Sequence, residues 1–278
     1  MDGFLKTALV ADALSLGAHW VYDQEEIIEA FPEGVVEFAE PMSDYHDDKR
    51  AGDQTHYGDQ AVMLRDSLET REGFDADGWR EDWLAAMEGY GGYVDGASKE
   101  TRRAEGMAPS PSSDLGGAAR IAAILDLGLP LEDAVKAVRA QTDLTHGDDQ
   151  VADAAEFFTR AAYAVDAGDI FEDAMDRAAA EGRYKKLHAQ EHMERTKELR
   201  DEAYLTVAEN LGQACEVSQA FPLALYFLLR PEMDFEQTIS DNAMAGGDSS
   251  ARAMLMALLF AAEDPEVAAE LVDGLRTH

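Results

Sequence analysis

The chain carries very little positive charge. Its 278 residues include 23 Lys and Arg against 57 Asp and Glu, which gives a formal net charge of −34 at pH 7. Nucleic acids and anionic membranes are bound mainly through basic patches, so neither is expected as a partner. An acidic surface repels itself at low ionic strength, and molar salt screens that repulsion. We therefore expect an acidic protein of halophilic type, adapted to a salty cytoplasm.

Cysteine and long apolar runs are equally scarce. Cys215 is the only cysteine, which excludes an internal disulfide, and its apolar surroundings predict a buried, inert thiol in a helical stretch. The longest purely apolar run, residues 253–262, is too short to cross a bilayer. Asp2 and Asp12 replace the basic n-region that a secretory signal would have. The expected location is the cytoplasm.

Strand-like alternation is almost absent, whereas apolar residues recur at helical spacing through most of the chain. Neither a linker nor a repeat divides the sequence. We predict an all-α protein with a single domain over residues 1–278. The predicted helices include residues 118–125, 151–165 and 251–262, with helix starts at Pro130 and Pro265 and irregular segments at 32–57 and 106–114.

Two aspartates that follow glycine open apolar helical stretches about 190 residues apart. They are Asp59, within residues 55–60, and Asp248, within residues 246–250. Aspartate is a favoured N-cap that stabilises its helix by about 1 kcal/mol, so either residue alone is typical of a cap. Taken together, two helix starts can direct both carboxylates at one point, which is typical of a ligand site.

A third aspartate, Asp12, falls on the apolar stripe of the first predicted helix. A carboxylate directed at a core is costly unless it is paired, so we expect Asp12 to have a defined partner. His19 follows this helix and is the histidine best placed to approach it as an acid–base group. His46 and His56 are candidates for the mouth of the same cleft, although each alone is more typical of a surface or satisfied residue.

Several short motifs occur in an order that one family shares. They are the glycine-rich helix at 8–17 (a GDALG-type segment), the Gly-Asp-Gln helix start at 58–60, the GNGAAMR-like segment at 116–120, the Thr-His pair at 145–146 and the GGDTDT-like run at 246–250. On this order the chain is identified as a member of the ADP-ribosylglycohydrolase family, helical enzymes related to dinitrogenase-reductase-activating glycohydrolase. The resemblance implies an orthogonal multi-helix bundle.

The resemblance also implies a hydrolase that cleaves an N- or O-glycosidic bond at ADP-ribose, with magnesium ions held by Asp and Thr oxygens. The implied partner is a small ribosyl or ADP-ribose-like ligand, or an ADP-ribosylated protein. The implied catalytic residues are Asp59, Asp248 and Asp12, the first two also as ligands of magnesium and the third as an orienting group. The implied substrate-binding residues are His19, Tyr57, Gly117, His146, Gly246, Gly247, Ser249 and Ser250.

The run at 246–250 offers backbone N–H groups and hydroxyls that suit a phosphate or a sugar. Arg252, one turn further on, is expected to be a solvated surface charge.

The chain departs from the family pattern at several ligand positions. Tyr57, Gly58 and Gln60 replace Thr, Asp and Thr of the first run, Ser250 and Ala251 replace Asp and Thr of the last, and Gly116 replaces an Asn. Two of the four family carboxylates remain, which suffices for one magnesium ion or none rather than a close pair. This pattern resembles the J1-crystallin-like branch, so a catalytically inactive, structural (crystallin-like) scaffold is the alternative function.

A remote alternative comes from residues 188–192, which match the H-x-x-E-H pattern of inverted zinc peptidases. His188 and His192 would hold zinc and Glu191 would activate water. The surrounding stretch has mixed charges typical of a solvated helix, and no third ligand stands out.

Overall fold

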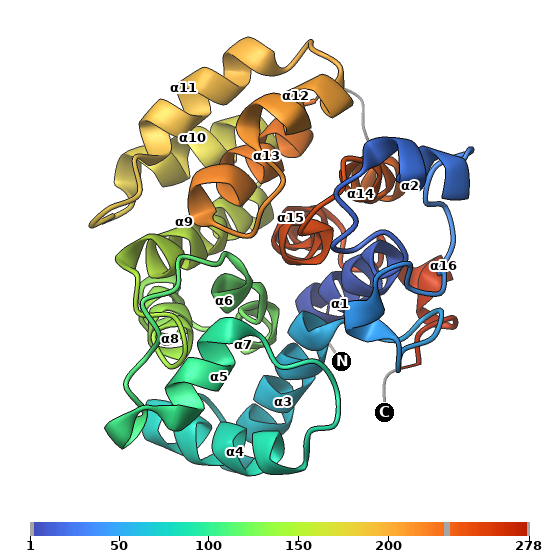
Figure 1. Cartoon of the computed structure of the whole chain (residues 1–278). Helices are drawn as coiled ribbons and strands as arrows, with labels where there is room; N and C mark the ends of the chain where they lie inside the picture. The colour runs from blue at the N-terminus through green and yellow to red at the C-terminus, as the bar shows by residue number, and fades with distance from the viewer. Residues whose placement is uncertain (1–2, 231–233, 277–278) are drawn as a thin grey trace.

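A computed structural model describes residues 3–230 and 234–276. Within these residues all regular structure is helical, apart from two isolated β-bridges. This confirms the all-α prediction (Figure 1). The helices are α1 (Gly3–Ser15), α2 (Gln24–Ala30), η1 (Asp44–His46), α3 (His56–Arg71), α4 (Ala76–Gly89), α5 (Gly96–Arg103), η2 (Glu105–Met107), α6 (Gly116–Ala119), α7 (Ala122–Leu125), α8 (Leu131–Thr142), α9 (Asp149–Asp166), α10 (Phe171–Glu181), α11 (Ala189–Leu199), α12 (Tyr204–Leu211), α13 (Val217–Leu229), α14 (Phe235–Met244), α15 (Ser249–Glu263) and α16 (Ala269–Val272).

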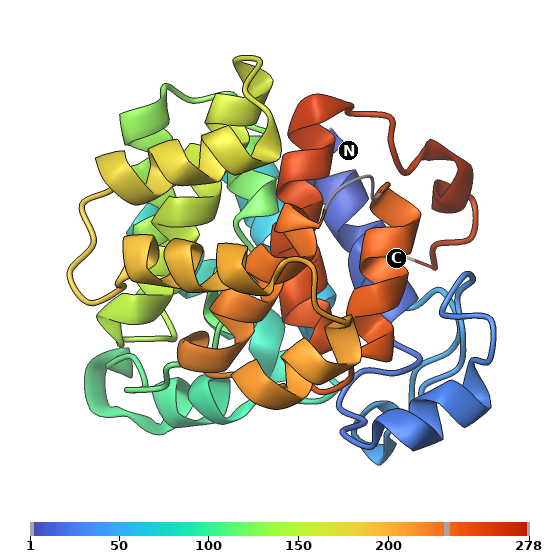
Figure 2. The same cartoon turned by 90° about the horizontal axis from the view of Figure 1, so that it is seen from above.

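Helix α15 forms the centre of the bundle. Figure 1 looks almost along this helix, and Figure 2 shows α1 and α14 beside it. It packs against α1, α9, α13 and α14. Every residue from Ser249 to Ala261 is buried, as expected for a helix that is apolar on all sides. Alanines such as Ala8 on α1 and Ala257 on α15 let neighbouring backbones approach closely.

The strongly periodic helices appear where the sequence predicts them. Helices α9 and α15 cover the expected ranges, and α8 begins directly after Pro130. The helix predicted over 118–125 is split into α6 and α7, because the ψ angles of Arg120 (−8°) and Ile121 (−20°) give 3₁₀-type hydrogen bonds there. Pro265 does not begin a helix, since residues 265–268 form turns and α16 starts at Ala269.

Two largely irregular segments, 31–55 and 104–115, lie where irregular structure is predicted. They bring His46 and Asp114 to the end of the bundle at which α15 begins. The described parts of the chain contain no helix that is both long and apolar enough to span a membrane.

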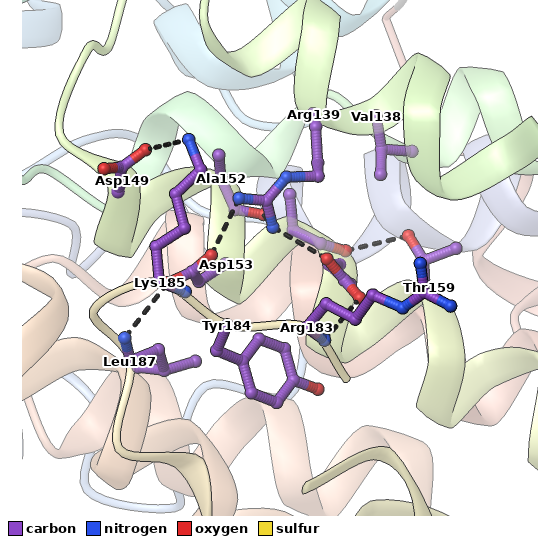
Figure 3. A network of polar contacts seen from close by, with 12 residues as sticks. Val138, Arg139, Asp149, Ala152, Asp153, Thr159, Arg183, Tyr184, Lys185 and Leu187 are labelled. Atoms are coloured by element: carbon purple, nitrogen blue, oxygen red, sulfur yellow. Dashed lines mark hydrogen bonds and ion pairs between the residues drawn. The ribbon is translucent and has the colours of Figure 1, made fainter. Parts of the chain in front are cut away.

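A buried network of charged groups fastens α9 to its surroundings (Figure 3). Asp153 accepts a hydrogen bond from Arg139 on α8 at 2.8 Å and three from the backbone N–H groups of residues 185–187 at 2.7 to 3.0 Å. Glu156 accepts from Arg139 at 2.7 Å and from Arg160 at 2.8 Å. Both carboxylates are therefore fully paired.

Candidate functional site

Asp248 is the N-cap residue of α15, as the sequence predicts, yet its carboxylate makes no capping hydrogen bond. The side chain is completely buried. Its Oδ2 accepts a hydrogen bond from the Tyr57 hydroxyl at 2.9 Å, whereas Oδ1 has no hydrogen-bond partner. Burial raises the pKa of Asp248 above its ordinary value. The carboxylate thus belongs to a polar cluster, while the Ala251 backbone N–H in the first turn of α15 partly offsets the effect of burial on its pKa.

The glycine run before α15 is a tight turn and not an anion site. Gly246 and Gly247 have φ angles of 81° and 70°, and a Cβ on Gly247 would lie 2.1 Å from a backbone carbonyl oxygen. The backbone N–H groups of residues 246–250 all donate to acceptors within the protein. The anion-binding role expected of these groups is therefore not supported. The hydroxyls of Ser249 and Ser250 are buried and have no partner.

Arg252 is completely buried, so the prediction of a solvated charge was wrong. Its Nε donates to Asn242 Oδ1 and its Nη2 to the Gly246 carbonyl, each at 2.7 Å. The Gly246 carbonyl needs a donor, which this guanidinium supplies. Arg252 consequently holds the turn that precedes Asp248.

Asp114 joins the cluster from the irregular segment before α6. One ligand atom from each of Asp114, Asp248 and Cys215 lies within 4.8 Å of the others, and the Tyr57 hydroxyl is 3.5 Å from Asp114 Oδ1. Burial and the neighbouring Asp248 raise the pKa of Asp114, and burial raises that of the Cys215 thiol. Cys215 lies in the connection before α13 and is only partly buried, which corrects its predicted helical position.

A cavity of about 370 Å³ opens beside Asp114. Its lining combines aromatic rings with two carboxylates and a thiol: Trp20, Tyr22, Tyr45, Tyr93, Asp95, Asp114 and Cys215. Trp20 has a left-handed φ of 61°, and its backbone N–H donates to the Gly247 carbonyl at 2.8 Å. Such strain in a bulky residue is costly and gathers at functional sites.

Three histidines, His19, His46 and His56, are completely buried next to this cavity. His19 Nδ1 lies 3.4 Å from the backbone nitrogen of Ser250 and 3.7 Å from Asp248 Oδ1. The predicted place of His46 and His56 at a cleft mouth is corrected, because both rings are inside the protein. Burial lowers the pKa of each histidine, to about 4 for His46 and about 3 for His56, so these two imidazoles are neutral at pH 7.

Asp59 lies on another side of α3. The N-cap of this helix is Thr55, whose hydroxyl accepts from the Tyr57 backbone nitrogen, so the predicted cap at Asp59 was wrong. Asp59 Oδ2 accepts from Lys49 at 2.5 Å and from Tyr90 at 2.6 Å, and Asp59 lines a separate cavity of about 440 Å³. Tyr57 and Asp59 are two positions apart on a helix and face different sides. The structure therefore does not bring Asp59 into the cluster around Asp248.

Asp12 is completely buried and has the defined partner that the sequence predicts. Its two oxygens accept from the Thr55 backbone nitrogen at 2.7 Å and from the Thr55 hydroxyl at 2.6 Å. Burial raises the pKa of Asp12 to about 7. A Cβ on Gly58 would lie 2.3 Å from Asp12 Oδ2, which explains the glycine there. Asp12 thus positions the start of α3 and, with it, Tyr57.

Gly117 and His146 pack against each other outside the lining of the aromatic cavity. A Cβ on Gly117 would lie 2.4 Å from the imidazole Cγ of His146. His146 Nδ1 is 2.9 Å from the Thr145 hydroxyl, and its Nε2 is buried without a partner. Gly116 similarly leaves room for Tyr57, because a Cβ on Gly116 would lie 2.0 Å from a carbon of that ring.

The H-x-x-E-H segment does not form a metal site among the described residues. His188 precedes α11 rather than lying on it, and its side chain is 72% exposed. Glu191 is equally exposed, while the His192 ring packs against Phe221 at 5.5 Å. Two ligands one helical turn apart are therefore not presented to a common cleft.

Sequence reasoning missed the cavity residues that belong to no motif. Asp114, Tyr93 and Asp95 lie in loops or at a loop end, where periodicity carries no information. For Asp114 the available signal was its position just before the glycine pair that opens α6, since helix starts favour aspartate.

The fold has relatives of known structure. A chain of an ADP-ribosylglycohydrolase-related protein complex is similar with a TM-score of 0.65 and 20% sequence identity, over 94% of this chain and 86% of that chain. No curated protein matches the chain significantly. The family model of ADP-ribosylglycohydrolase matches residues 3–275. This chain belongs to the ADP-ribosylglycohydrolase family.

Proposed function

We propose that the protein binds the ribosyl part of an ADP-ribose-like ligand in the aromatic cavity and hydrolyses its N- or O-glycosidic bond. Family membership supports the reaction class. The observation that carries the proposal is a cavity of about 370 Å³ whose four aromatic rings surround a space that reaches Asp114. This volume is in the range of about 300–1,000 Å³ common to small-molecule sites. Aromatic faces suit a sugar or base ring.

The charge of the lining indicates which part of the ligand enters. Two carboxylates, Asp95 and Asp114, line the cavity, and no lysine or arginine is among its lining residues. A diphosphate would be repelled there, so a neutral ribose and its neutral or cationic acceptor group occupy the interior. The diphosphate would then lie outside the cavity. Lys99 is a basic group near this position, because its Nζ lies 4.9 Å from the centroid of the Tyr93 ring in the cavity wall.

Asp114 is the carboxylate placed to contact the ligand, because it lines the cavity while Asp248 is completely buried. Asp95, the other carboxylate of the lining, already accepts hydrogen bonds from Ser98 and Gln60. Glycosidic cleavage passes through an oxocarbenium-like state that needs a proton donor and nearby negative charge. Without a bound ion, Asp114 takes the acid–base role. Asp248 and Asp12 are positioning residues, since Asp248 holds the Tyr57 hydroxyl and Asp12 fixes the helix start that carries Tyr57.

Magnesium, which the family resemblance implies, fits the pair Asp114 and Asp248 better than Asp59. Magnesium prefers carboxylate oxygens, and Asp248 Oδ1 is a buried oxygen without a partner. Asp59 Oδ2 already pairs with the Lys49 ammonium, which repels a cation. The proposal places at most one ion at Asp114 and Asp248. Such an ion would supply positive charge for ribose hydroxyls or water.

Isothermal titration of wild-type protein in molar KCl tests this function. ADP-ribose, free ribose and pyrophosphate are injected separately, with and without magnesium chloride. We expect heat from both ribosyl ligands and none from pyrophosphate. Hydrolysis of an ADP-ribosylated acceptor should fall by roughly 100-fold or more in Asp114→Asn, the scale of a lost acid–base group. Asp173→Asn, exposed on α10, is the matched control and should match wild type.

The inactive, crystallin-like scaffold is the outcome that opposes this proposal. It is favoured by the replaced family ligands and by the pairing of Asp59 with Lys49. Folded wild-type protein that binds neither ADP-ribose nor ribose would exclude the hydrolase and leave the scaffold.

A further inference from the structure

We propose that His19, His46 and His56 form a binding site for one divalent transition-metal ion of the zinc class. One ring nitrogen from each histidine lies within 4.8 Å of those from the other two. The three residues come from the turn after α1, the end of η1 and the first position of α3. The tertiary fold therefore assembles the set, which distinguishes it from a chance pair on one helix.

The shortest separation within the set matches a coordination geometry. His46 Nε2 and His56 Nδ1 are 3.3 Å apart. Two nitrogens bound tetrahedrally to zinc at 2.0–2.1 Å are separated by about 3.3 Å, so these atoms already stand at ligand spacing. The third nitrogen lies within 4.8 Å, so it has to move by at most roughly 1.5 Å to reach the same spacing.

The histidines have unused ring nitrogens in a place without solvent. His19 Nε2, His46 Nδ1 and His56 Nε2 are all buried and have no hydrogen-bond partner. Buried polar atoms are normally paired, and His19 Nε2 is the one of these three that the ion would pair. His46 and His56 would bind through the other two nitrogens, Nε2 and Nδ1, which now face each other. Metal binding would replace the hydrogen bond between His46 and His56 and the long one from the Ser250 backbone N–H to His19 Nδ1.

Asp248 supplies the supporting contact that metal-bound histidines usually have. Its unpartnered Oδ1 lies 3.7 Å from His19 Nδ1. If His19 binds the ion through Nε2, its proton moves to Nδ1, where it replaces the 3.4 Å contact with the Ser250 backbone N–H. The proton can then be donated to this carboxylate, which fixes the ring and its tautomer. The same carboxylate thereby connects the histidine set to the cluster around Tyr57.

The ligand type selects the metal. Imidazole nitrogen suits zinc, copper, nickel and related ions, whereas magnesium requires oxygen. Three nitrogen ligands leave a fourth position for water or another ligand. The Trp20 ring lies over the set, with centroid distances of 4.6 Å to His19, 5.4 Å to His46 and 5.0 Å to His56. The ion would therefore sit behind the cavity wall and tie the irregular segment 31–55 to α1 and α3.

Cobalt titration of metal-free full-length protein tests the site, because tetrahedral Co²⁺ absorbs visible light and reports nitrogen ligation. We expect intense visible bands that saturate at one equivalent, disappear when zinc is added and do not appear with magnesium. His46→Gln and His56→Gln should each weaken binding by about 100-fold or more, and Asp248→Asn by about 10- to 100-fold. His188→Gln, an exposed histidine, should bind as wild type does.

Circular dichroism and thermal melting establish that each variant is folded, and the wild-type titration is decisive even if a variant is not. Folded wild type without saturable cobalt bands would overturn the site. So would cobalt binding that survives in both folded glutamine variants. The outcome is independent of the proposed hydrolase function, because it needs neither a ribosyl ligand nor turnover.

Discussion

The network around α9 and the cluster at the start of α15 are both buried and polar, but they differ in how their groups are paired. At α9 every carboxylate oxygen of Asp153 and Glu156 accepts a hydrogen bond. At α15 one oxygen of Asp248 and the hydroxyls of Ser249 and Ser250 accept none. An unpaired buried group costs roughly 1–3 kcal/mol. The first region is therefore arranged for stability, and the second retains groups that a ligand can satisfy.

This contrast yields a criterion for finding sites in a chain with weakened motifs. Burial and charge are common to both regions, so neither identifies a site. Of the ten buried side-chain atoms without a partner among the described residues, six gather in one place, beside an aromatic cavity and a strained Trp20. Proteins tolerate such costs mainly where function requires them.

The largest expected change in the free energy of unfolding comes from the fully paired network around α9. Asp153→Ala removes one of the two carboxylate partners of Arg139 and leaves the backbone N–H groups of residues 185–187 without their acceptor. Loss of one partner of a buried ion pair costs about 3–5 kcal/mol, which urea unfolding in molar KCl would measure. Asp149→Ala, which removes the exposed partner of Lys185, should barely move the midpoint. Equal losses of stability in the two variants would show that the buried network around α9 is not arranged for stability.

The stability of the protein is expected to depend on pH through Asp12. Its pKa is raised by burial to about 7 when folded, against 3.8 as its ordinary value, with Asp59 raising it and Lys49 lowering it. The folded state binds the extra proton between these values, so its stability falls as pH rises from about 4 to 7, by at most about 4 kcal/mol. Unfolding free energies of wild type and Asp12→Asn across this range are compared. The decline should be shallower in the variant, and parallel curves would contradict the prediction.

A smaller effect of opposite sign is expected at α15. Ser250→Ala removes a buried hydroxyl that has no partner, so stability should be unchanged or rise by about 1 kcal/mol. Ser67→Ala, which removes a hydroxyl bonded to Asp82 at 2.6 Å, is the contrasting control and should lose stability. A clear loss in Ser250→Ala would show that its hydroxyl is paired, and the contrast between the two regions would weaken.

The smallest effect is expected from Asp59→Asn on ribosyl binding. The sequence pairs Asp59 with Asp248, but Asp59 lines the separate cavity with Lys49. Its replacement should change the affinity for ribose far less than Asp114→Asn does, as measured by titration calorimetry. A loss equal to that of Asp114→Asn would restore the pairing that the sequence suggests.

The sequence predicted the regular parts of the fold because burial there follows helical periodicity. Helices α9 and α15 are examples, with apolar residues repeating on buried faces. The start of α3 was misplaced because it depends on Thr55 binding Asp12, 43 positions away, a contact that local cap preferences do not contain.

The site was only partly predictable for the same reason. Asp12 was found as a polar residue on an apolar stripe, Asp248 as a helix start after glycine, and His19 from its place after the Asp12 helix. All three are completely buried. Arg252 was misjudged because its partners are inward-facing carbonyl groups. Asp114 could be recognised only from the fold, which places its loop against the start of α15. Adaptation to high salt, a single domain and a cytoplasmic location stay predictions.

The position of Trp20 also has a spectroscopic consequence. The chain has three tryptophans, and Trp79 and Trp83 are buried in the core while Trp20 is partly exposed on the cavity wall. Only Trp20 has histidine rings against it among the described residues. Its indole emission is thus a built-in reporter. A ribosyl ligand in the cavity would shift its wavelength, and a paramagnetic ion on the histidines would quench it, so the two events carry separate signals.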